Sequence, residues 1–290
     1  MHVKLRFYET YYLCFIVDEI LKNIADHLVN LDGFHCDGQW AGWLAPYKKY
    51  SVFHQFIEFV ARDVHSDQAE KVDMAERREI FNSYENIPAA LHDLKPYQLP
   101  IEEAFAHHGI EYQSFSDHLI DVGKSFQNAG DDDVYEFMND VWLSESYEKL
   151  LEQTVTEVFH VLFQNRNLLL DFNEYVSSIL CHARREDAED LNQSLLSPNG
   201  TLLRVRPPQW AQRAVFYRDR GRCVLCDRDL SGLLNLGNVE NYDHIIPLAR
   251  FGFNDISNLQ LLCEYCNKIE KKDGAAITSG RYQSWYSAED

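Results

Sequence analysis

The sequence predicts a mostly α-helical protein with a small α+β domain at its C-terminal end. Apolar residues recur at helical spacing through most of residues 1–195, and strand-like alternation is nearly absent there. The last third differs, because it contains two pairs of cysteines and two short apolar segments with strand character. We therefore expect two domains, which is also the usual number for a chain of 290 residues.

Residues 1–195 are predicted to form an all-α domain. Apolar residues in the segment 7–31 step by four and three, which places them on one face of a long helix that ends at Asp32-Gly33. Further helices are predicted at 51–64, 74–86, 88–94, 101–108, 115–128, 133–143, 146–170 and 172–191.

Turn-forming residues separate this domain from the next. The cluster Ser197-Pro198-Asn199-Gly200 is followed by Pro207-Pro208, so residues 196–209 are predicted to be a linker. Residues 210–290 then form the second domain, which begins with a helix over about 209–220. We expect the tail from residue 278 onward to pack back on the helical domain.

Composition narrows the class of protein. Hydrophobic residues make up 46% of the chain, as in ordinary globular proteins. No charged-then-apolar leader opens the sequence and no apolar run approaches eighteen residues, which argues against secretion and against a membrane span. Seven cysteines, an odd number, fit a reducing compartment. We therefore expect a cytoplasmic protein without a membrane partner.

Four of the cysteines have the spacing of a zinc site. Cys223 and Cys226 form one CxxC pair, Cys263 and Cys266 form the other, and 36 residues separate the pairs. A two-residue gap lets both sulfurs of a pair reach one ion, and two such pairs complete a tetrahedral shell. The sequence therefore predicts a structural Zn²⁺ site. The alternative is a zinc knuckle that has no catalytic neighbour.

The segment around these pairs is predicted to fold as strand, loop, strand and helix. Residues 239–246 are apolar and β-branched enough for a strand, which Pro247 ends. Residues 259–262 suit a short buried strand. Residues 264–272 contain helix formers, with lysines in the last turn and Gly274 just beyond. So small a unit cannot form a sufficient core, and a bound metal supplies the missing stability.

Four polar residues of this segment suit catalysis or metal binding: Asp243, His244, Asn258 and Asn267. His244 can exchange a proton near neutral pH, so it suits a general base. Asp243 and Asn267 offer hard oxygen ligands, which suit Mg²⁺ or Mn²⁺. Taken separately, three of them have a simpler explanation: His244 as an ordinary strand histidine, Asn258 as a turn residue and Asn267 as a surface helix residue.

The order of the cysteines and these four residues resembles the HNH endonuclease family, in its zinc-stapled subset with a ββα-metal finger. The resemblance covers about fifty of the 290 residues. It implies that Asp243 and Asn267 hold the catalytic metal, that His244 deprotonates the attacking water, and that Asn258 braces the loop orienting His244. Asn267 stands where the family name implies a histidine. Asp243 and His244 are neighbours, so a regular strand would direct them to opposite faces, and a bend or bulge near Pro247 would be needed for both to serve one phosphate.

Charge differs sharply between the two parts of the chain. Residues 204–290 carry 12 Lys and Arg against 11 Asp and Glu, whereas residues 1–203 carry 15 against 35. An acidic surface repels DNA, so double-stranded DNA should bind the C-terminal domain. Its predicted phosphate contacts are Arg213, Arg218, Arg220, Arg222, Arg250, Lys268, Lys271 and Lys272.

Together these observations and the resemblance indicate a metal-dependent DNA endonuclease. One active site cuts one strand, so a monomer would nick DNA. Analogy suggests a bacterial restriction or anti-phage defence effector whose acidic helical domain regulates the nuclease or binds a protein partner. Two other classes stay open: a non-catalytic zinc-stapled DNA-binding module and a helical interaction protein. The target sequence, the choice of DNA or RNA, and the oligomeric state are not determined by the sequence.

Overall fold

The computed structural model describes residues 9–84, 98–182, 194–232, 241–271 and 274–281. It is mostly α-helical with one two-stranded sheet near the C-terminal end, which confirms the predicted fold class. The predicted helix at 88–94 lies outside the described residues. Two compact units are present: Met1–Leu13 with Glu58–Val158, and Cys14–Ile57 with Phe159–Asp290. These units do not follow the predicted division at 196–209, which stays a prediction.

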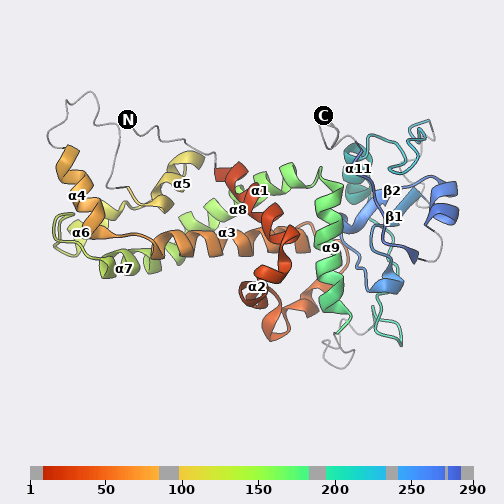
Figure 1. Cartoon of the computed structure of the whole chain (residues 1–290), viewed down its shortest axis with the longest axis horizontal. Coiled ribbons are helices and arrows are strands. Elements are labelled where there is room, and N and C mark those ends of the chain that lie inside the picture. The colour runs from red at the N-terminus through yellow and green to blue at the C-terminus, as the bar shows by residue number, and fades with distance from the viewer. Residues whose placement is uncertain (1–8, 85–97, 183–193, 233–240, 272–273, 282–290) are drawn as a thin grey trace. The chain divides into compact units, whose positions relative to one another are not determined.

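Figure 1 labels the elements along the chain. The α-helices are α1 (Glu9–Lys22), α2 (Leu28–His35), α3 (Val52–Glu70), α4 (Met74–Tyr84), α5 (Pro100–His108), α6 (Phe115–Asp121), α7 (Asp131–Trp142), α8 (Glu145–Leu162), α9 (Arg166–Leu180) and α11 (Gln209–Arg218). The strands are β1 (Tyr242–His244) and β2 (Leu259–Leu261). Short 3-10 segments are η1 (Ile24–Asp26), η2 (Cys36–Leu44), η6 (Leu248–Arg250) and η7 (Ile256–Asn258). A π-helical turn, η8, spans Cys266–Glu270. None of these helices has the length and apolar character needed to cross a membrane.

Two predicted helices are each interrupted. The helix predicted at 7–31 ends as α1 at Lys22, and the chain restarts as η1 and α2. Asn23 donates its side-chain amide to the carbonyl of Glu19, which lets the side chain compete with helix continuation. The helix predicted at 146–170 breaks between α8 and α9, because the Asn165 side chain accepts from the backbone N–H of Leu168 (3.2 Å) and caps a new helix.

The first unit has an aromatic core. The side chains of Phe105, Phe115, Phe137 and Tyr147 are almost completely buried. Glu102 is buried among them and accepts from the backbone N–H groups of Leu99 (2.7 Å) and Phe115 (3.1 Å). This carboxylate therefore satisfies the amide that precedes α5 and the first amide of α6, two groups that helices leave unpaired.

The second unit also has an aromatic core, formed by helices and by the η2 segment. Phe34 stacks on Trp43 with ring centroids 4.9 Å apart, and Phe53 lies against Phe172 at 4.8 Å. Trp43 is only 2% exposed. The aromatic segment around η2 is therefore part of the core.

The cysteine-containing segment lies in the same unit and is hydrogen-bonded to these helices. The buried carboxylate of Asp255 accepts from the Val52 N–H at the start of α3 (3.0 Å). The Asn173 side chain of α9 donates to the Ser257 carbonyl (3.1 Å). Burial raises the pKa of Asp255, although its hydrogen bonds oppose the rise. Polar contacts of this kind fix the small sheet relative to α3 and α9.

The strands are shorter than predicted. β1 and β2 are antiparallel, with Asp243 opposite Gln260 and His244 opposite Leu259. The region predicted as a helix over 264–272 forms one α-helical turn that widens into η8, where the Lys271 N–H bonds to the Cys266 carbonyl five residues back (3.0 Å). At the tail, Arg166 of α9 donates to the carbonyls of Ser279 and Arg281 (2.9 and 2.8 Å), while residues 282–290 lie outside the described range.

Candidate functional site

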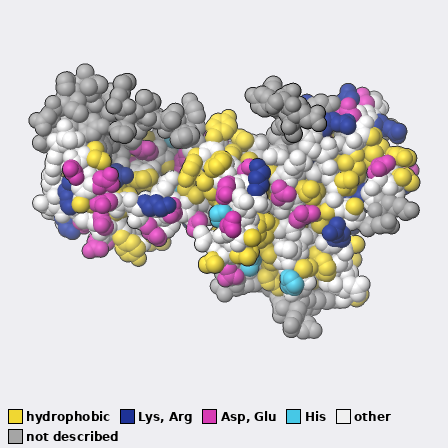
Figure 2. Space-filling model, in the orientation of Figure 1, with side chains coloured by type: hydrophobic (Ala, Val, Ile, Leu, Met, Phe, Trp, Pro, Cys, Tyr) yellow, Lys and Arg dark blue, Asp and Glu magenta, His cyan; other side chains and the backbone are white. Residues whose placement is uncertain are grey.

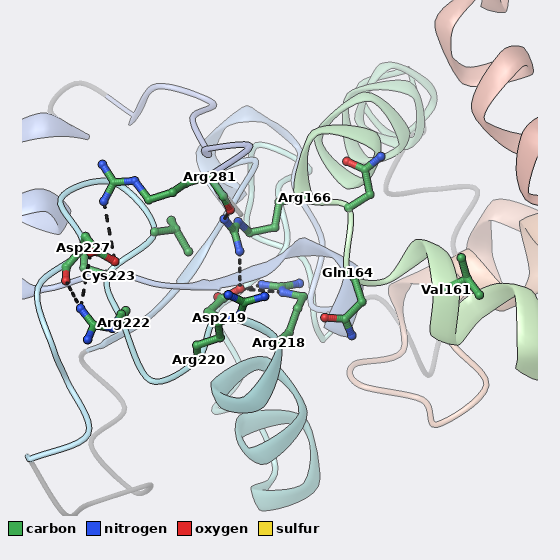
Figure 3. Close-up of a pocket in the computed structure, with 12 residues that line it drawn as sticks. Val161, Gln164, Arg166, Arg218, Asp219, Arg220, Arg222, Cys223, Asp227 and Arg281 are labelled. Atoms are coloured by element: carbon green, nitrogen blue, oxygen red, sulfur yellow. Dashed lines mark hydrogen bonds and ion pairs between the residues drawn. The ribbon is translucent and has the colours of Figure 1, made fainter. Parts of the chain in front are cut away.

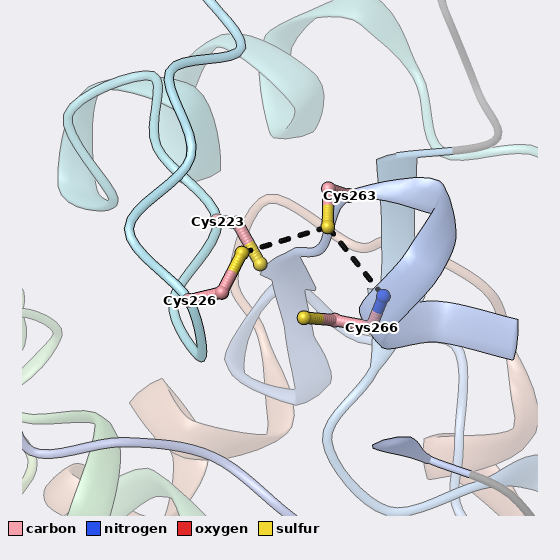
Figure 4. Close-up of side chains that lie close together, drawn as sticks. All are labelled: Cys223, Cys226, Cys263 and Cys266. Atoms are coloured by element: carbon pink, nitrogen blue, oxygen red, sulfur yellow. Dashed lines mark hydrogen bonds between the residues drawn. The ribbon is translucent and has the colours of Figure 1, made fainter. Parts of the chain in front are cut away.

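The four cysteines come together, as predicted. Their sulfur atoms all lie within 4.8 Å of one another, and the sulfurs of Cys226 and Cys263 are 3.6 Å apart (Figure 4). A tetrahedral zinc ion with Zn–S bonds of about 2.3 Å places its sulfurs about 3.8 Å apart. The residues therefore fit zinc, and the cluster suggests zinc binding.

Backbone geometry holds the first cysteine pair against the sheet. The Cys223 N–H bonds to the Arg228 carbonyl (2.9 Å), and the Val224 N–H bonds to the Leu261 carbonyl of β2 (3.0 Å). Asp227 turns the chain with a positive φ of 63°. The second pair follows β2 directly, so one strand organises both halves of the cluster.

Asp243 lies on β1 between two cationic side chains. One carboxylate oxygen is 3.2 Å from the guanidinium of Arg204, and the other accepts from the ammonium of Lys271. Asp243 and Lys271 are buried, whereas Arg204 is half-exposed. The sequence prediction missed both cations as partners of Asp243, because neither is near it along the chain.

Lys271 marks a position that suits a cation. Its ammonium also donates to the His244 carbonyl, so it lies between a carboxylate oxygen and a carbonyl oxygen. Burial lowers the pKa of Lys271. The negative charge of Asp243 raises this pKa, and the positive charge of Arg204 lowers it further. Hard oxygen donors of this kind are those that Mg²⁺ or Mn²⁺ prefers, so Asp243 fits the predicted metal provided that the ammonium moves away.

His244 is buried beside this position. The residue is 2% exposed, and neither ring nitrogen has a hydrogen-bond partner among the described residues. Asn254 is a polar side chain that interacts with the imidazole and opposes the fall in its pKa, although its amide also bonds to the backbone of Leu203 and Val205. Burial lowers the pKa of His244 to about 4, and the charge of Arg204 acts in the same direction. Buried polar atoms without a partner are rare in native structures and call for a functional explanation.

Asn258 closes the loop that follows β1. Its side-chain oxygen accepts from the Ile246 N–H (2.8 Å), and its amide donates to the carbonyls of Ile246 (3.1 Å) and Phe253 (3.0 Å). Gly252 lies under this loop, where an added Cβ would be 2.0 Å from the Ile246 carbonyl oxygen. The loop can close this tightly only with glycine at that position.

The remaining predicted residues differ in how exposed they are to solvent. Asn267 is half-buried in η8, directly after Cys266. Arg213, Arg220, Arg222, Arg250 and Lys268 are exposed. The guanidinium of Arg218 is fully buried against Asp219, and Lys271 is buried against Asp243, so these two offer no surface to DNA. Lys272 lies outside the described residues.

No bend separates Asp243 from His244, which lie on consecutive positions of β1. The strand ends at His244, and the chain bends directly afterwards, at Ile245 and Ile246, before η6 begins. The expected bend near Pro247 is therefore present, but it follows both residues. The side-chain carboxylate of Asp243 and the backbone carbonyl of His244 nevertheless meet at the Lys271 ammonium.

Comparison with known proteins agrees with this geometry. Residues 223–273 match the family described as HNH endonuclease. The chain contains an HNH endonuclease domain. No curated protein and no solved structure matches the chain. The HNH domain suggests nucleic-acid binding and a nuclease-type function, and its match covers both cysteine pairs together with Asp243, His244, Asn258 and Asn267.

Proposed function

We propose that the protein is a metal-dependent endonuclease that hydrolyses phosphodiester bonds in double-stranded DNA. The observation that carries this proposal is the buried imidazole of His244, which has unpartnered nitrogens and lies beside a carboxylate within an HNH domain. In this proposal His244 accepts the proton of the attacking water, and Asn258 holds the loop that orients it.

Asp243 and Asn267 are the proposed ligands of Mg²⁺ or Mn²⁺. When bound, such an ion stabilises negative charge on the phosphate. The ammonium of Lys271 already lies on two oxygens at this position, which supports the presence of a cation site. Zn²⁺ at the four cysteines would hold the fold and take no part in hydrolysis.

Access to His244 requires local opening, because the ring is buried in this structure. Arg204 is the exposed partner of Asp243. The side chain of Asn254 hydrogen-bonds to the backbone of Leu203 and Val205, the residues on either side of Arg204. We propose that a DNA phosphate draws the guanidinium of Arg204 away from Asp243, since both anions compete for the same group.

The proposed phosphate contacts are the exposed residues Arg213, Arg220, Arg222, Arg250 and Lys268, together with Lys272. Contacts of this type position DNA without reading its sequence. Reversing several of the exposed arginines to glutamate should weaken binding to all sequences alike and flatten its salt dependence. An unchanged salt dependence would contradict this assignment.

The biological setting is also a proposal. We propose a cytoplasmic effector of bacterial restriction or anti-phage defence that nicks DNA as a monomer. On the face shown in Figure 2, Asp and Glu gather over α4, α6 and α7, where Asp131, Asp132, Glu136 and Asp140 are exposed. This acidic surface repels DNA and is suited to a basic protein partner.

The direct test is conversion of supercoiled plasmid to the nicked form with added Mg²⁺ or Mn²⁺. His244→Ala should abolish nicking, whereas His160→Ala, a change at an exposed histidine of α8, should leave it intact. Thermal unfolding of each variant shows whether the fold is retained. Equal nicking by wild type and His244→Ala would exclude His244 as the base.

The burial of His244 favours one other function, a zinc-stapled DNA-binding module without catalysis. In that case the chain would bind DNA tightly, and no divalent metal would promote cleavage. A third function, in which the helices bind a protein partner and the HNH domain is a scaffold, would leave partner binding intact in Asp243→Ala and His244→Ala variants. The plasmid assay and a DNA-binding titration distinguish these outcomes.

A further inference from the structure

An arginine-lined cavity of about 430 Å³ lies in the second unit, between the start of α9, the end of α11, the first cysteine pair and the tail (Figure 3). Two aspartates also line it, Asp219 and Asp227. The five arginines in its wall are Arg166, Arg218, Arg220, Arg222 and Arg281. The chain as a whole has a net charge of −19, yet the wall of this cavity has five arginines and only two aspartates.

The inner part of the wall has more positive charge than negative charge. Asp219 is shared by Arg166 (3.2 Å) and Arg218 (2.8 Å), and the three side chains are at most 5% exposed. Asp219 also accepts from the Leu261 N–H of β2 (2.9 Å). One carboxylate therefore balances two buried guanidinium groups, and an uncompensated buried charge is costly in free energy.

The outer part repeats this imbalance closer to solvent. Asp227 lies 3.4 Å from Arg222 and 3.7 Å from Arg281, so one acid again faces two arginines. Arg220 is exposed at the cavity and is held there by a backbone with a positive φ of 57°. These longer contacts leave the outer guanidinium groups able to turn toward a stronger anion.

A second feature of the wall is a buried donor without an acceptor. Nη1 of Arg218 has no hydrogen-bond partner among the described residues, while its Nε and Nη2 atoms bond to Asp219. Asn165, the cap of α9, also lines the cavity, so the positive end of this helix adds to the field there. Excess guanidinium charge, an unmet donor and a walled volume converge at one place.

We propose that this cavity binds a phosphate group, presented either by a nucleic-acid backbone or by a free nucleotide. The volume suits about one nucleotide, since ligand pockets of roughly 300–1,000 Å³ hold small molecules. Binding of a nucleic-acid backbone in this cavity rests on the proposed function, because Arg220 and Arg222 are among the proposed DNA contacts. The proposal adds Arg166 and Arg281, and it places Arg218, which is buried and offers no outer surface to DNA, in the inner wall of a defined site.

Such a site would also touch the sheet that bears the catalytic residues. The floor of the cavity bonds to β2 through Asp219 to the Leu261 N–H and through Arg218 to the Leu259 carbonyl. β2 pairs with β1, where His244 lies opposite Leu259. A phosphate in the cavity would therefore neutralise charge beside side chains that are hydrogen-bonded to β2, the strand paired with β1.

The test uses the full chain without added Mg²⁺ or Mn²⁺, so binding is measured apart from cleavage. Calorimetric titrations with inorganic phosphate, a 5′-deoxynucleotide and a short DNA duplex are compared for wild type, Arg220→Gln/Arg281→Gln and the control Arg228→Gln. Arg228 is exposed near the first cysteine pair but does not line the cavity.

We expect the double variant to weaken binding at least about tenfold, since each arginine makes charge-assisted contacts, and the control to change it little. Binding of the nucleotide would identify a free nucleotide as the source of the phosphate. Binding of the duplex alone would identify the backbone. Equal affinity in wild type and double variant, or no binding of any probe, would overturn the proposal. Plasmid nicking is measured separately, so a failure of the proposed nuclease activity remains distinguishable.

Discussion

The buried ammonium of Lys271 donates a hydrogen bond to the buried carboxylate of Asp243. Arg204 lies on the other carboxylate oxygen at 3.2 Å. One carboxylate is thus held by two cations in a region of low dielectric, where opposite charges attract strongly. A divalent ion at Asp243 would have to replace at least one of them, so metal binding and the position of Lys271 are coupled.

Replacing Lys271 with methionine should expose this coupling. Without metal, Lys271→Met should lower the free energy of unfolding by about 3 kcal/mol, because it removes one partner of a buried ion pair. Added Mn²⁺ should then raise the melting temperature more in the variant than in wild type, since the ion takes over the charge of the ammonium. Thermal unfolding with and without Mn²⁺ measures both effects.

The control for this prediction is Lys268→Met. Lys268 is exposed in the same η8 turn and pairs with Glu264 at the surface (2.6 Å), where ion pairs contribute little. It should change neither stability nor the response to Mn²⁺. An equal response to Mn²⁺ in wild type and Lys271→Met would contradict the coupling.

Asn258→Ala should destabilise the loop between β1 and β2. The substitution removes three hydrogen bonds to the backbone of Ile246 and Phe253 and leaves buried groups unpaired. We expect a loss of about 3 kcal/mol in the free energy of unfolding, measured by urea denaturation. Asn258→Asp keeps the acceptor for the Ile246 N–H but loses both donors, so it should also destabilise. Wild-type stability in both variants would show that the loop does not depend on this side chain.

Removing one sulfur should release the zinc ion. Cys226→Ser leaves three thiolates in the cluster, and a hydroxyl is a poor replacement ligand. We expect the zinc content to fall well below one ion per chain and the melting temperature to drop, because metal binding and folding are linked. Elemental analysis and thermal unfolding measure these effects. Cys181→Ser, which changes an exposed cysteine outside the cluster, should keep both values.

His54 should make the protein less stable in mild acid. Burial lowers its pKa to about 4, and the charge of His160 lowers it further, while its Nδ1 accepts from the Ser51 N–H (3.1 Å). A folded-state pKa below the unfolded value of about 6.5 means that the folded chain binds fewer protons. This contribution to stability is full above about pH 6.5 and is lost as the pH falls to about 4, up to about 3 kcal/mol.

The matched variant for His54 is His54→Asn, which retains an acceptor near Ser51 and removes the titrating ring. Its free energy of unfolding, measured by urea denaturation between pH 7 and pH 4, should vary less with pH than that of wild type. Parallel pH profiles for the two proteins would show that another group causes the acid sensitivity.

Local patterns in the sequence were sufficient to predict the cysteine cluster and the fold class. The CxxC spacing predicted a cluster that the structure shows, because two-residue gaps impose a geometry that does not depend on distant residues. The mostly helical fold followed from the spacing of apolar residues. Helix boundaries were less predictable, because caps such as Asn165 compete with a continuous apolar face.

The sequence by itself determined the zinc-type cysteine cluster and the short strands around it. Only the tertiary structure decided which charges those residues meet. Arg218 and Lys271 looked like surface cations in the sequence, yet both are buried against carboxylates. The reason is that burial depends on elements distant along the chain. Lys271 pairs with Asp243 of β1, 28 residues away, and Arg218, although its partner Asp219 is the next residue, is buried against the Phe163 ring and the Leu259 carbonyl of β2. Periodicity carries no information about those contacts.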